Sequence, residues 1–284
     1  MLLQRVITAL VLLAILLPAL FANSPVPFTA VVLVLIAAGG WEWGRLNGRG
    51  QAVSMACGLA CLLLCLAAWQ AGWTTRPLHG LWLAAGAAWV AVAALLLRAG
   101  VAGWPRIPLA LRLPVGILAL WLAWLAVAQA RAIGINFLLS VLVLVWVADI
   151  GAYFAGRTFG LRFTRGKLAP SISPGKSWEG VWGGFLGVLV LALAWVAADR
   201  HFGALVPSLY SRLLGRGWWL LAAALVFLVA MSVAGDLVES LVKRAAGAKD
   251  SSRLLPGHGG VLDRVDALLP TLPLALMLSG FTSP

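Results

Sequence analysis

Apolar runs of about 20 residues recur along the whole of this chain, and they leave few architectures open. Each run is long enough to cross the hydrocarbon core of a bilayer as a helix. Lipid offers no partner to unpaired backbone groups, so only helices and closed barrels can span it. The runs lack the alternating polar positions of a barrel strand. We therefore predict an all-α, polytopic membrane helical bundle of about nine transmembrane helices, at residues 6–22, 28–44, 52–72, 80–97, 113–130, 136–156, 178–198, 218–238 and 261–281.

The composition agrees with this class and excludes a soluble domain. Of the 284 residues, 62% are hydrophobic and 11% are charged, which is too apolar a surface for water. No internal repeat or low-complexity linker divides the chain. We expect a single integral membrane domain over residues 1–284, with apolar N-terminal helices in 1–130 and the polar site in 131–284.

The basic residues predict how the bundle lies in the membrane. With the N-terminus inside, the cytoplasmic segments carry roughly three times as many Lys and Arg as the opposite side, which is the positive-inside pattern. The polar loops 157–177 and 239–260 then face the cytoplasm of a bacterial-type inner membrane. Arg5, an apolar run and small residues near Ala22 also fit a signal peptide. The later spans make an uncleaved first helix the simpler expectation.

The net charge of +12 has two interpretations. Topology and attraction to anionic lipid headgroups explain Arg45, Arg49, Arg98 and Arg106. The alternative is an anionic substrate bound by the two basic loops. We expect no nucleic-acid partner, because the cations are divided among short loops and form no basic domain that could lie along a duplex.

Carboxylates gather in the second half of the chain, where seven of the nine lie at predicted helix ends or in polar loops; only Glu42 and Asp199 lie elsewhere. Four polar side chains share one face at the end of the eighth predicted helix, because they are spaced i, i+3, i+4 and i+7: Asp236, Glu239, Ser240 and Lys243. Asp263 and Asp266 share a face at the start of the ninth. The loop between them returns to the same membrane surface, so the two faces can meet.

Four carboxylates brought together near lipid would repel one another or take up protons. A bound divalent cation resolves this, and all-oxygen ligation suits Mg²⁺. The alternative is that the carboxylates only form ion pairs with Lys243, Arg244 and Arg264. Intramembrane carboxylates are usually functional, which favours the metal.

Two loops are candidates for binding an anion. Pro256–Gly257–His258–Gly259–Gly260 is a glycine-rich turn whose amides could reach a phosphate, although a plain re-entry turn would have the same composition. In the other loop, Ser177 can cap the seventh helix, and the helix end beside Lys176 suits a phosphate. Asp149 could join the same pocket. Gly175–Lys176–Ser177 resembles the end of a P-loop, but Pro170 replaces its first glycine and we expect no strand before it, which excludes a Walker site.

Together these residues resemble the phosphatidate cytidylyltransferase (CDP-diacylglycerol synthase) family. The signature of that family matches Ser240, Lys243–Arg244, Lys249–Asp250, Ser252, Leu255–Pro256, His258–Gly259–Gly260, Asp263–Arg264 and Asp266, with no departure. Residues 148–153 and 173–180 are also similar to family segments. The resemblance covers roughly residues 145–270, and residues 1–130 share only their apolar spans with the family.

The resemblance implies an enzyme that joins CTP to phosphatidate, with Mg²⁺, and releases CDP-diacylglycerol and pyrophosphate. Asp236 and Asp263 would then be the metal ligands, with Glu239, Asp149 and Asp266 as weaker candidates. Asp236, Asp263, Lys243 and Arg264 would form the catalytic set. The remaining residues would bind substrate: Lys176, Ser177, Ser240, Arg244, Lys249, His258, Gly259 and Gly260.

Two alternatives stay open at this point. A CTP-dependent lipid-alcohol kinase would use related chemistry on a similar bundle. A membrane transporter also carries intramembrane charge, but there the charge is expected at midplane and not at one face. The expected partners are CTP and phosphatidate in the bilayer, without nucleic acid, and a homodimer is possible.

Overall fold

The computed structural model describes residues 2–282, and that part of the chain is almost entirely helical. Eight of its helices are long and apolar enough to cross a membrane. These are α1 (Leu2–Phe21), α2 (Val26–Leu46), α3 (Gln51–Gln70), α4 (His79–Gly103), α5 (Leu109–Ile133), α6 (Ile135–Phe159), α7 (Trp178–His201) and α9 (Trp218–Ala245). The shorter elements are the 3₁₀-helix η1 (Trp104–Arg106), the helices α8 (Leu209–Leu214), α10 (Leu262–Val265) and α11 (Leu268–Gly280), and the strands β1 (Lys167–Ala169) and β2 (Ser173–Ser177).

The all-α membrane bundle predicted from the apolar runs is confirmed, and its ninth segment is divided. Residues 261–281 form α10 and α11 in place of one long helix. Pro270 explains the break, because a proline amide cannot donate to the carbonyl of Asp266 as a continuous helix would require. With the break before Leu268, Pro270 lies in the first turn of α11, where no such bond is needed.

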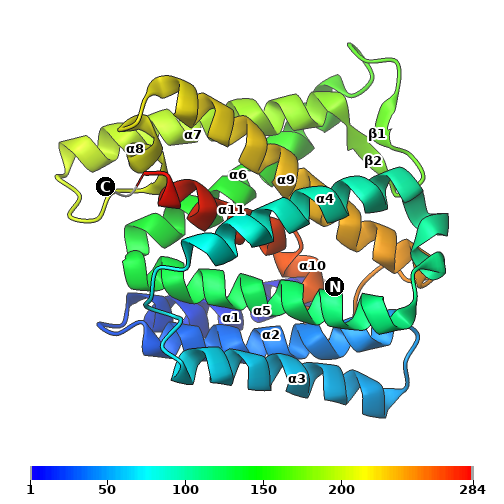
Figure 1. The fold of residues 1–284 in the computed structure, drawn as a ribbon. Coiled ribbons are helices and arrows are strands. Elements are labelled where there is room, and N and C mark those ends of the chain that lie inside the picture. The colour runs from blue at the N-terminus through cyan, green and yellow to red at the C-terminus, as the bar shows by residue number, and fades with distance from the viewer. Residues whose placement is uncertain (1, 283–284) are drawn as a thin grey trace.

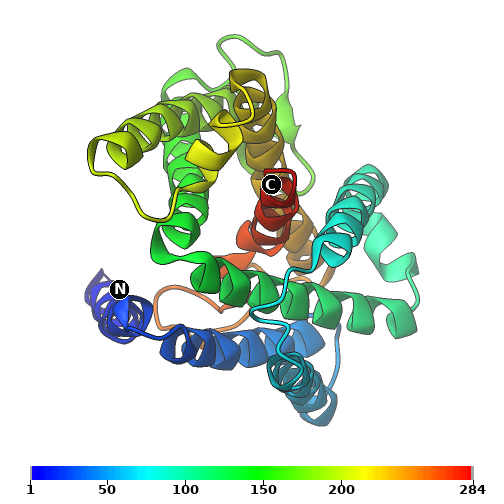
Figure 2. The same ribbon diagram turned by 60° about the vertical axis from the view of Figure 1, so that its left-hand side comes forward.

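Helix α11 lies at the centre of the bundle (Figures 1 and 2). It contacts α4, α5, α9 and α6, and Leu272, Leu274 and Ala275 are buried between them. The helices α1, α2 and α3 form a layer on one side, beyond α5, while α6, α7 and α8 lie on the other side with α9. The bundle therefore holds α11, which begins two residues after Asp266, the last residue of the family signature.

Small residues let α6 and α7 pack with their backbones in contact. A Cβ on Gly184 would lie 2.7 Å from the carbonyl oxygen of Ala148, and one on Gly151 would lie 2.8 Å from that of Gly183. Such close approach is typical of membrane helices, which gain little from burying apolar surface. The contact places Asp149, next to Ala148, beside the start of α7.

The loop between α6 and α7 differs from the prediction, since it contains a short β-hairpin. Strands β1 and β2 pair antiparallel, with Lys167 opposite Ser177 and Ala169 opposite Ser173. We expected no strand here, because these polar residues lack the alternation of a half-buried strand. The expectation that no strand precedes Pro170 is therefore wrong, because β1 ends at Ala169. A Walker site is still excluded, because Gly175–Lys176–Ser177 lies in β2 and not in a loop that joins a strand to a helix.

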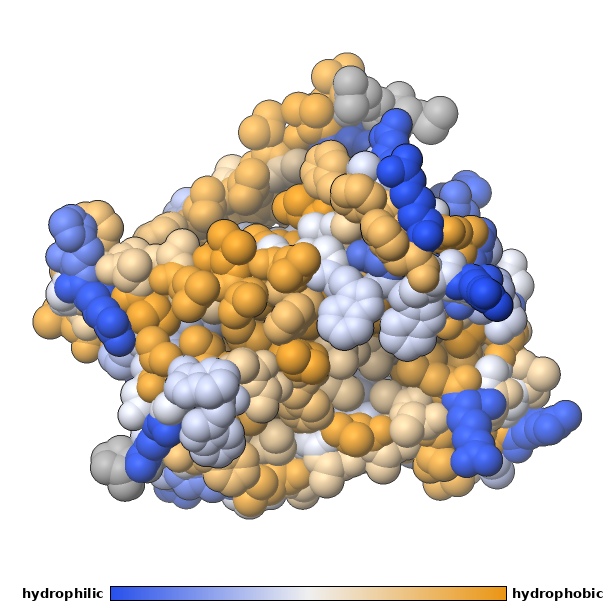
Figure 3. Space-filling model, turned by 90° about the horizontal axis from the view of Figure 1, so that it is seen from above, coloured by the Kyte–Doolittle hydropathy of each residue, from blue (hydrophilic) through white to orange (hydrophobic). Residues whose placement is uncertain are grey.

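Viewed from the side of α7 and α9, the surface has an apolar centre with hydrophilic side chains at its two ends (Figure 3). The helices run between those ends (Figure 1). An apolar band between two polar rims is what a bilayer requires of a spanning bundle.

Candidate active site

A mixed polar and apolar cavity of about 510 Å³ opens between α6, the hairpin, α7 and α9. Its lining includes Asp149 of α6, Lys176 and Ser177 of β2, and Asp236 of α9. The predicted residues of the 173–180 loop and of the eighth predicted helix therefore meet in one cavity, although about 60 residues separate them in the chain.

Lys176 and Asp236 form the central contact of this cavity. The ammonium group of Lys176 lies 2.5 Å from Oδ2 of Asp236, and the two side chains are 25% and 30% exposed. The Ser240 hydroxyl donates to the other oxygen of Asp236, at 3.2 Å. Ser177 ends β2 and caps α7, where its hydroxyl oxygen accepts from the amide of Gly180 at 3.2 Å, as the sequence predicted. Lys176 is thereby fixed at the start of α7.

Two further carboxylates interact with this pair. Asp149 interacts electrostatically with Asp236 and with Lys176. Asp266, between α10 and α11, also interacts electrostatically with Asp236 and with Asp149. Burial raises the pKa of Asp266, and the like charge of Asp236 raises it further. Asp149, Asp236 and Asp266 therefore form a group of three carboxylates beside Lys176.

Lys243 joins α9 to α10 in a second polar cluster. Its ammonium group lies 2.5 Å from Oε2 of Glu239 and 2.6 Å from Oδ1 of Asp263. Burial alone would raise the pKa of Asp263, but hydrogen bonds from Lys243, Gly260 and Ser251 outweigh it and hold the pKa below its usual value. Asp263 is therefore ionised, and both of its carboxylate oxygens accept hydrogen bonds.

The four carboxylates predicted to meet are divided between these two clusters. Asp236 pairs with Lys176, and Lys243 bridges Glu239 and Asp263. Over residues 2–282, no three His, Cys, Asp or Glu side chains stand close enough together, as placed, to hold a metal ion. The donors around Lys176 nevertheless fit a divalent cation, because they are the oxygen atoms of three carboxylates.

The loop 246–261 follows α9 and turns sharply at its glycines. Gly257 and Gly259 have φ of +76° and +81°, which other residues adopt only at a cost in energy. The amide of Leu255 donates to the Gly259 carbonyl at 2.8 Å. The amide of Gly260, predicted to meet a phosphate, instead donates to Oδ2 of Asp263 at 2.8 Å.

The predicted phosphate-binding cations of this loop lie at its surface. Arg264 donates to the carbonyl of His258 at 3.0 Å, and Arg244 donates to that of Ala248 at 3.4 Å. Among residues 2–282, the ion pairs of the site are formed by Lys176 and Lys243, and neither of these arginines takes part in one. Lys249 lines a separate polar cavity of about 690 Å³, together with Arg45 and Arg253.

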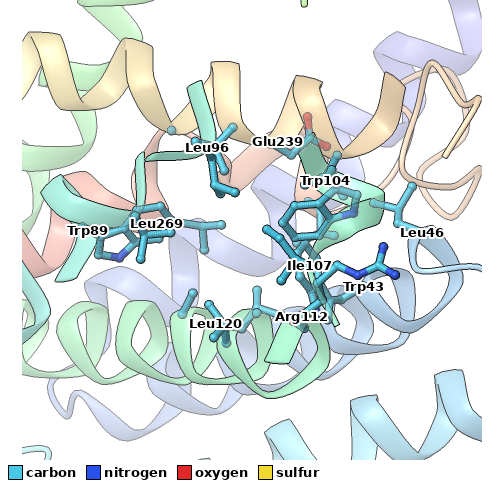
Figure 4. Close-up of a pocket in the computed structure, with 18 of the residues that line it drawn as sticks. Trp43, Leu46, Trp89, Leu96, Trp104, Ile107, Arg112, Leu120, Glu239 and Leu269 are labelled. Atoms are coloured by element: carbon cyan, nitrogen blue, oxygen red, sulfur yellow. Dashed lines mark hydrogen bonds between the residues drawn. The ribbon is translucent and has the colours of Figure 1, made fainter. Parts of the chain in front are cut away.

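An apolar cavity of about 400 Å³ lies on the opposite side of α9 (Figure 4). Trp89 and Leu269 lie toward one end of it, while Trp104, Arg112 and Glu239 lie toward the other. The Arg112 guanidinium stacks on the Trp104 ring, 5.5 Å from its centroid. No sequence pattern predicts this cavity, because its lining comes from six helices and η1.

Glu42 contacts the signature loop, although it was not among the predicted site residues. It lies in α2 with none of its surface exposed, and its carboxylate accepts four hydrogen bonds from residues 251–262. A lone carboxylate in an apolar span is itself a functional signal. That signal could have identified Glu42, but its partners are more than 200 residues away.

Comparison with known proteins identifies the family of this chain. The Cytidylyltransferase family matches residues 3–281. A phosphatidate cytidylyltransferase of Pseudomonas aeruginosa is 41% identical over 296 aligned residues, which cover both chains completely. One from Haemophilus influenzae is 51% identical over 49% of this chain and 44% of its own. One from Staphylococcus epidermidis is 39% identical over 53% of this chain and 51% of its own.

This chain belongs to the cytidylyltransferase family. The resemblance stated from residues 145–270 is confirmed, and the match also takes in the apolar N-terminal helices. As a cytidylyltransferase, the protein is a nucleotidyltransferase enzyme. The assignment of individual site residues stays a prediction.

Proposed function

We propose that this cytidylyltransferase joins CTP to phosphatidate. A phosphate oxygen of phosphatidate attacks the α-phosphorus of CTP, the bond to the bridging oxygen breaks, and pyrophosphate leaves with that electron pair. The products are CDP-diacylglycerol and pyrophosphate. The observation that carries this proposal is the full-length similarity to a phosphatidate cytidylyltransferase, in a membrane bundle where Asp149, Lys176 and Asp236 line one cavity.

The reaction requires charge neutralisation and positioning more than proton transfer. The attacking phosphate is already ionised, so no strong general base is needed. Lys176 and Lys243 are each held by carboxylates, which fix their ammonium groups within the protein. We assign these lysines, with Arg244, Lys249 and Arg264, to the phosphate groups.

The carboxylates of the site would hold Mg²⁺, which supplies positive charge to the phosphate oxygens. Asp236 and Asp263 are the first candidates as ligands, with Glu239, Asp149 and Asp266 beside them. Asp263 would have to exchange Lys243 for the cation. Asp149 and Asp266 carry no such lysine contact among the described ion pairs, so they are the nearest additional ligands for Asp236.

The apolar cavity beside α9 suits an acyl chain of phosphatidate. Apolar side chains line it almost throughout, and Arg112 lies at the end nearer Glu239. A guanidinium at that end would attract an anionic headgroup. We place the reacting headgroup at the end of this cavity where Arg112 and Glu239 lie, on the cytoplasmic side of a bacterial inner membrane.

The proposal is tested with purified protein, Mg²⁺, phosphatidate and CTP labelled at the α-phosphorus. We expect the label in CDP-diacylglycerol and an equal amount of unlabelled pyrophosphate. In a parallel reaction with diacylglycerol in place of phosphatidate, label in CDP together with newly formed phosphatidate would instead identify a kinase. Absence of any lipid-linked label, with folded protein and both substrates present, would refute the proposal.

A further inference from the structure

Glu42 of α2 is joined to the signature loop by four hydrogen bonds. Oε1 accepts from the Ser252 hydroxyl at 2.5 Å and from the Val261 amide at 2.9 Å. Oε2 accepts from the Ser251 hydroxyl at 3.2 Å and from the Leu262 amide at 2.8 Å. One fully buried side chain thus contacts both ends of the segment 251–262.

Burial makes these bonds energetically important. A carboxylate removed from water costs several kcal/mol unless hydrogen bonds replace its hydration. The amides of Val261 and Leu262 belong to the start of α10, where no carbonyl within the helix can accept from them. Glu42 and the loop therefore satisfy each other's hydrogen-bonding groups, and the Ser251 hydroxyl contacts Asp263 as well.

The contact leaves no free space. A Cβ on Gly260 would collide with both Ser251 Oγ and the Glu42 carboxylate. Gly260 is therefore required at this position of the signature by the carboxylate of a helix far away in the sequence. The loop cannot shift toward α2 without a steric clash, nor away from it without losing the hydrogen bonds.

Ser251 extends the contact to the reacting groups. Its hydroxyl lies 3.2 Å from Glu42 Oε2 and 2.9 Å from Asp263 Oδ2, and its amide also donates to Asp263 at 2.9 Å. Asp263 in turn holds Lys243 at 2.6 Å. A continuous chain of contacts runs from α2 through the loop to the polar face of α9.

We propose that Glu42 is a positioning residue, which holds the loop 251–262 so that Asp263 and Lys243 keep their orientation toward the substrates. It has no contact with the cavity of Lys176 and Asp236, and acts only through the loop. The inference rests on the proposed function for its kinetic consequence, but the structural consequence can be measured without it.

The test compares Glu42→Gln with Asp199→Asn. Asp199 is a matched control, because its carboxylate also accepts four hydrogen bonds, from Asn136, Ser208 (twice) and Ser211, at the opposite end of the bundle. Glutamine offers one acceptor oxygen in place of two, and its NH₂ group would face donors. Both variants are measured per folded molecule, and Ser252→Ala serves as a milder change if Glu42→Gln fails to fold.

We expect Glu42→Gln to lower kcat at least about tenfold, because small displacements of reacting groups have such effects. We also expect faster trypsin cleavage after Arg253, the exposed arginine next to Ser252. Asp199→Asn should change neither. Wild-type kcat or wild-type cleavage in Glu42→Gln would overturn the inference, as would an equal kcat loss in Asp199→Asn. If the wild-type protein makes no CDP-diacylglycerol, the proposed function fails. The cleavage rates alone then decide whether Glu42 holds the loop 251–262.

Discussion

At the scale of residues, the site is a set of carboxylates paired with two lysines. Lys176 and Lys243 occupy positions where a divalent cation could also neutralise the negative charge. Removing a carboxylate therefore affects both the lysine it holds and the metal it would bind. The consequences differ from those of removing an arginine that faces only lipid headgroups.

We expect Asp236→Asn and Asp263→Asn each to abolish turnover while the protein still inserts and purifies normally. An amide is a poor substitute for a carboxylate that binds a metal or orients an ammonium group. The measurement is kcat at saturating Mg²⁺, with Asp199→Asn as the control. Near-normal activity in both variants would remove these residues from the metal site.

Lys176→Ala is expected to lower kcat/KM at least about tenfold, which corresponds to roughly 1.4 kcal/mol. Lys176 lies just before α7 and contacts Asp236 of α9. A phosphate there would interact with the lysine charge and with the amides at the start of α7. Arg49→Ala, in an exposed turn between α2 and α3, should change kcat/KM little. Both variants are measured against CTP and against phosphatidate. Greater damage from Arg49→Ala would place the anion site elsewhere.

At the scale of elements, the helix α9 separates two environments. Asp236 and Ser240 line or approach the polar cavity on one side, while Val238 and Val242 line the apolar cavity on the other. A single amphipathic helix end thus lies between the proposed sites for the nucleotide and for the acyl chain. Changes on α5, across the apolar cavity, should affect the lipid alone.

Ala119→Phe places a ring in the apolar cavity and should lower kcat/KM for dioleoyl phosphatidate at least about tenfold, because overpacking excludes a long chain. Dihexanoyl phosphatidate should be used nearly as well as by the wild type. Leu118→Phe is the control, since Leu118 is adjacent on α5 and 46% exposed at the outer surface. An equal loss for both lipids, or a raised KM for CTP, would contradict the acyl-chain assignment.

Local sequence patterns predicted the helices and the faces that their polar residues share. They could not predict the contacts between residues that are far apart in the chain. The spacing of Asp236, Glu239, Ser240 and Lys243 follows from helix periodicity, and Ser177 has an ordinary capping signal. The β-hairpin lacks an apolar alternation. The partners of Glu42 lie in a loop that only the folded bundle brings to α2. The two lysine clusters likewise depend on which side chains meet across helices.

At the scale of the whole molecule, the polar site lies at one end of the bundle. The loop 251–262 contacts α2 near its last turn, and Lys176 precedes α7. The turn after α2 is therefore at the end of the site, and the turn after α3 is at the opposite end. The positive-inside pattern predicts that the end with the site faces the cytoplasm.

Cysteine labelling of intact cells and of inverted vesicles tests this orientation. A membrane-impermeant maleimide should label Arg49→Cys only in inverted vesicles and Arg76→Cys only in intact cells. The three native cysteines, Cys57, Cys61 and Cys65, are free and buried, so we expect little background because reaction requires an accessible thiolate. The reverse labelling pattern would place the site outside the cytoplasm.

The central position of α11 has a consequence for biosynthesis. The ribosome makes residues 262–280 after all eight long helices, yet this segment fills the middle of the bundle and contacts α4, α5, α6 and α9. The earlier helices must remain open to one another, or separate again, until it arrives. N-terminal parts of a chain generally fold first, but here translation must pass Asp266 before the carboxylates and lysines can assemble. A nascent chain therefore remains without a complete site until its last helix is inserted.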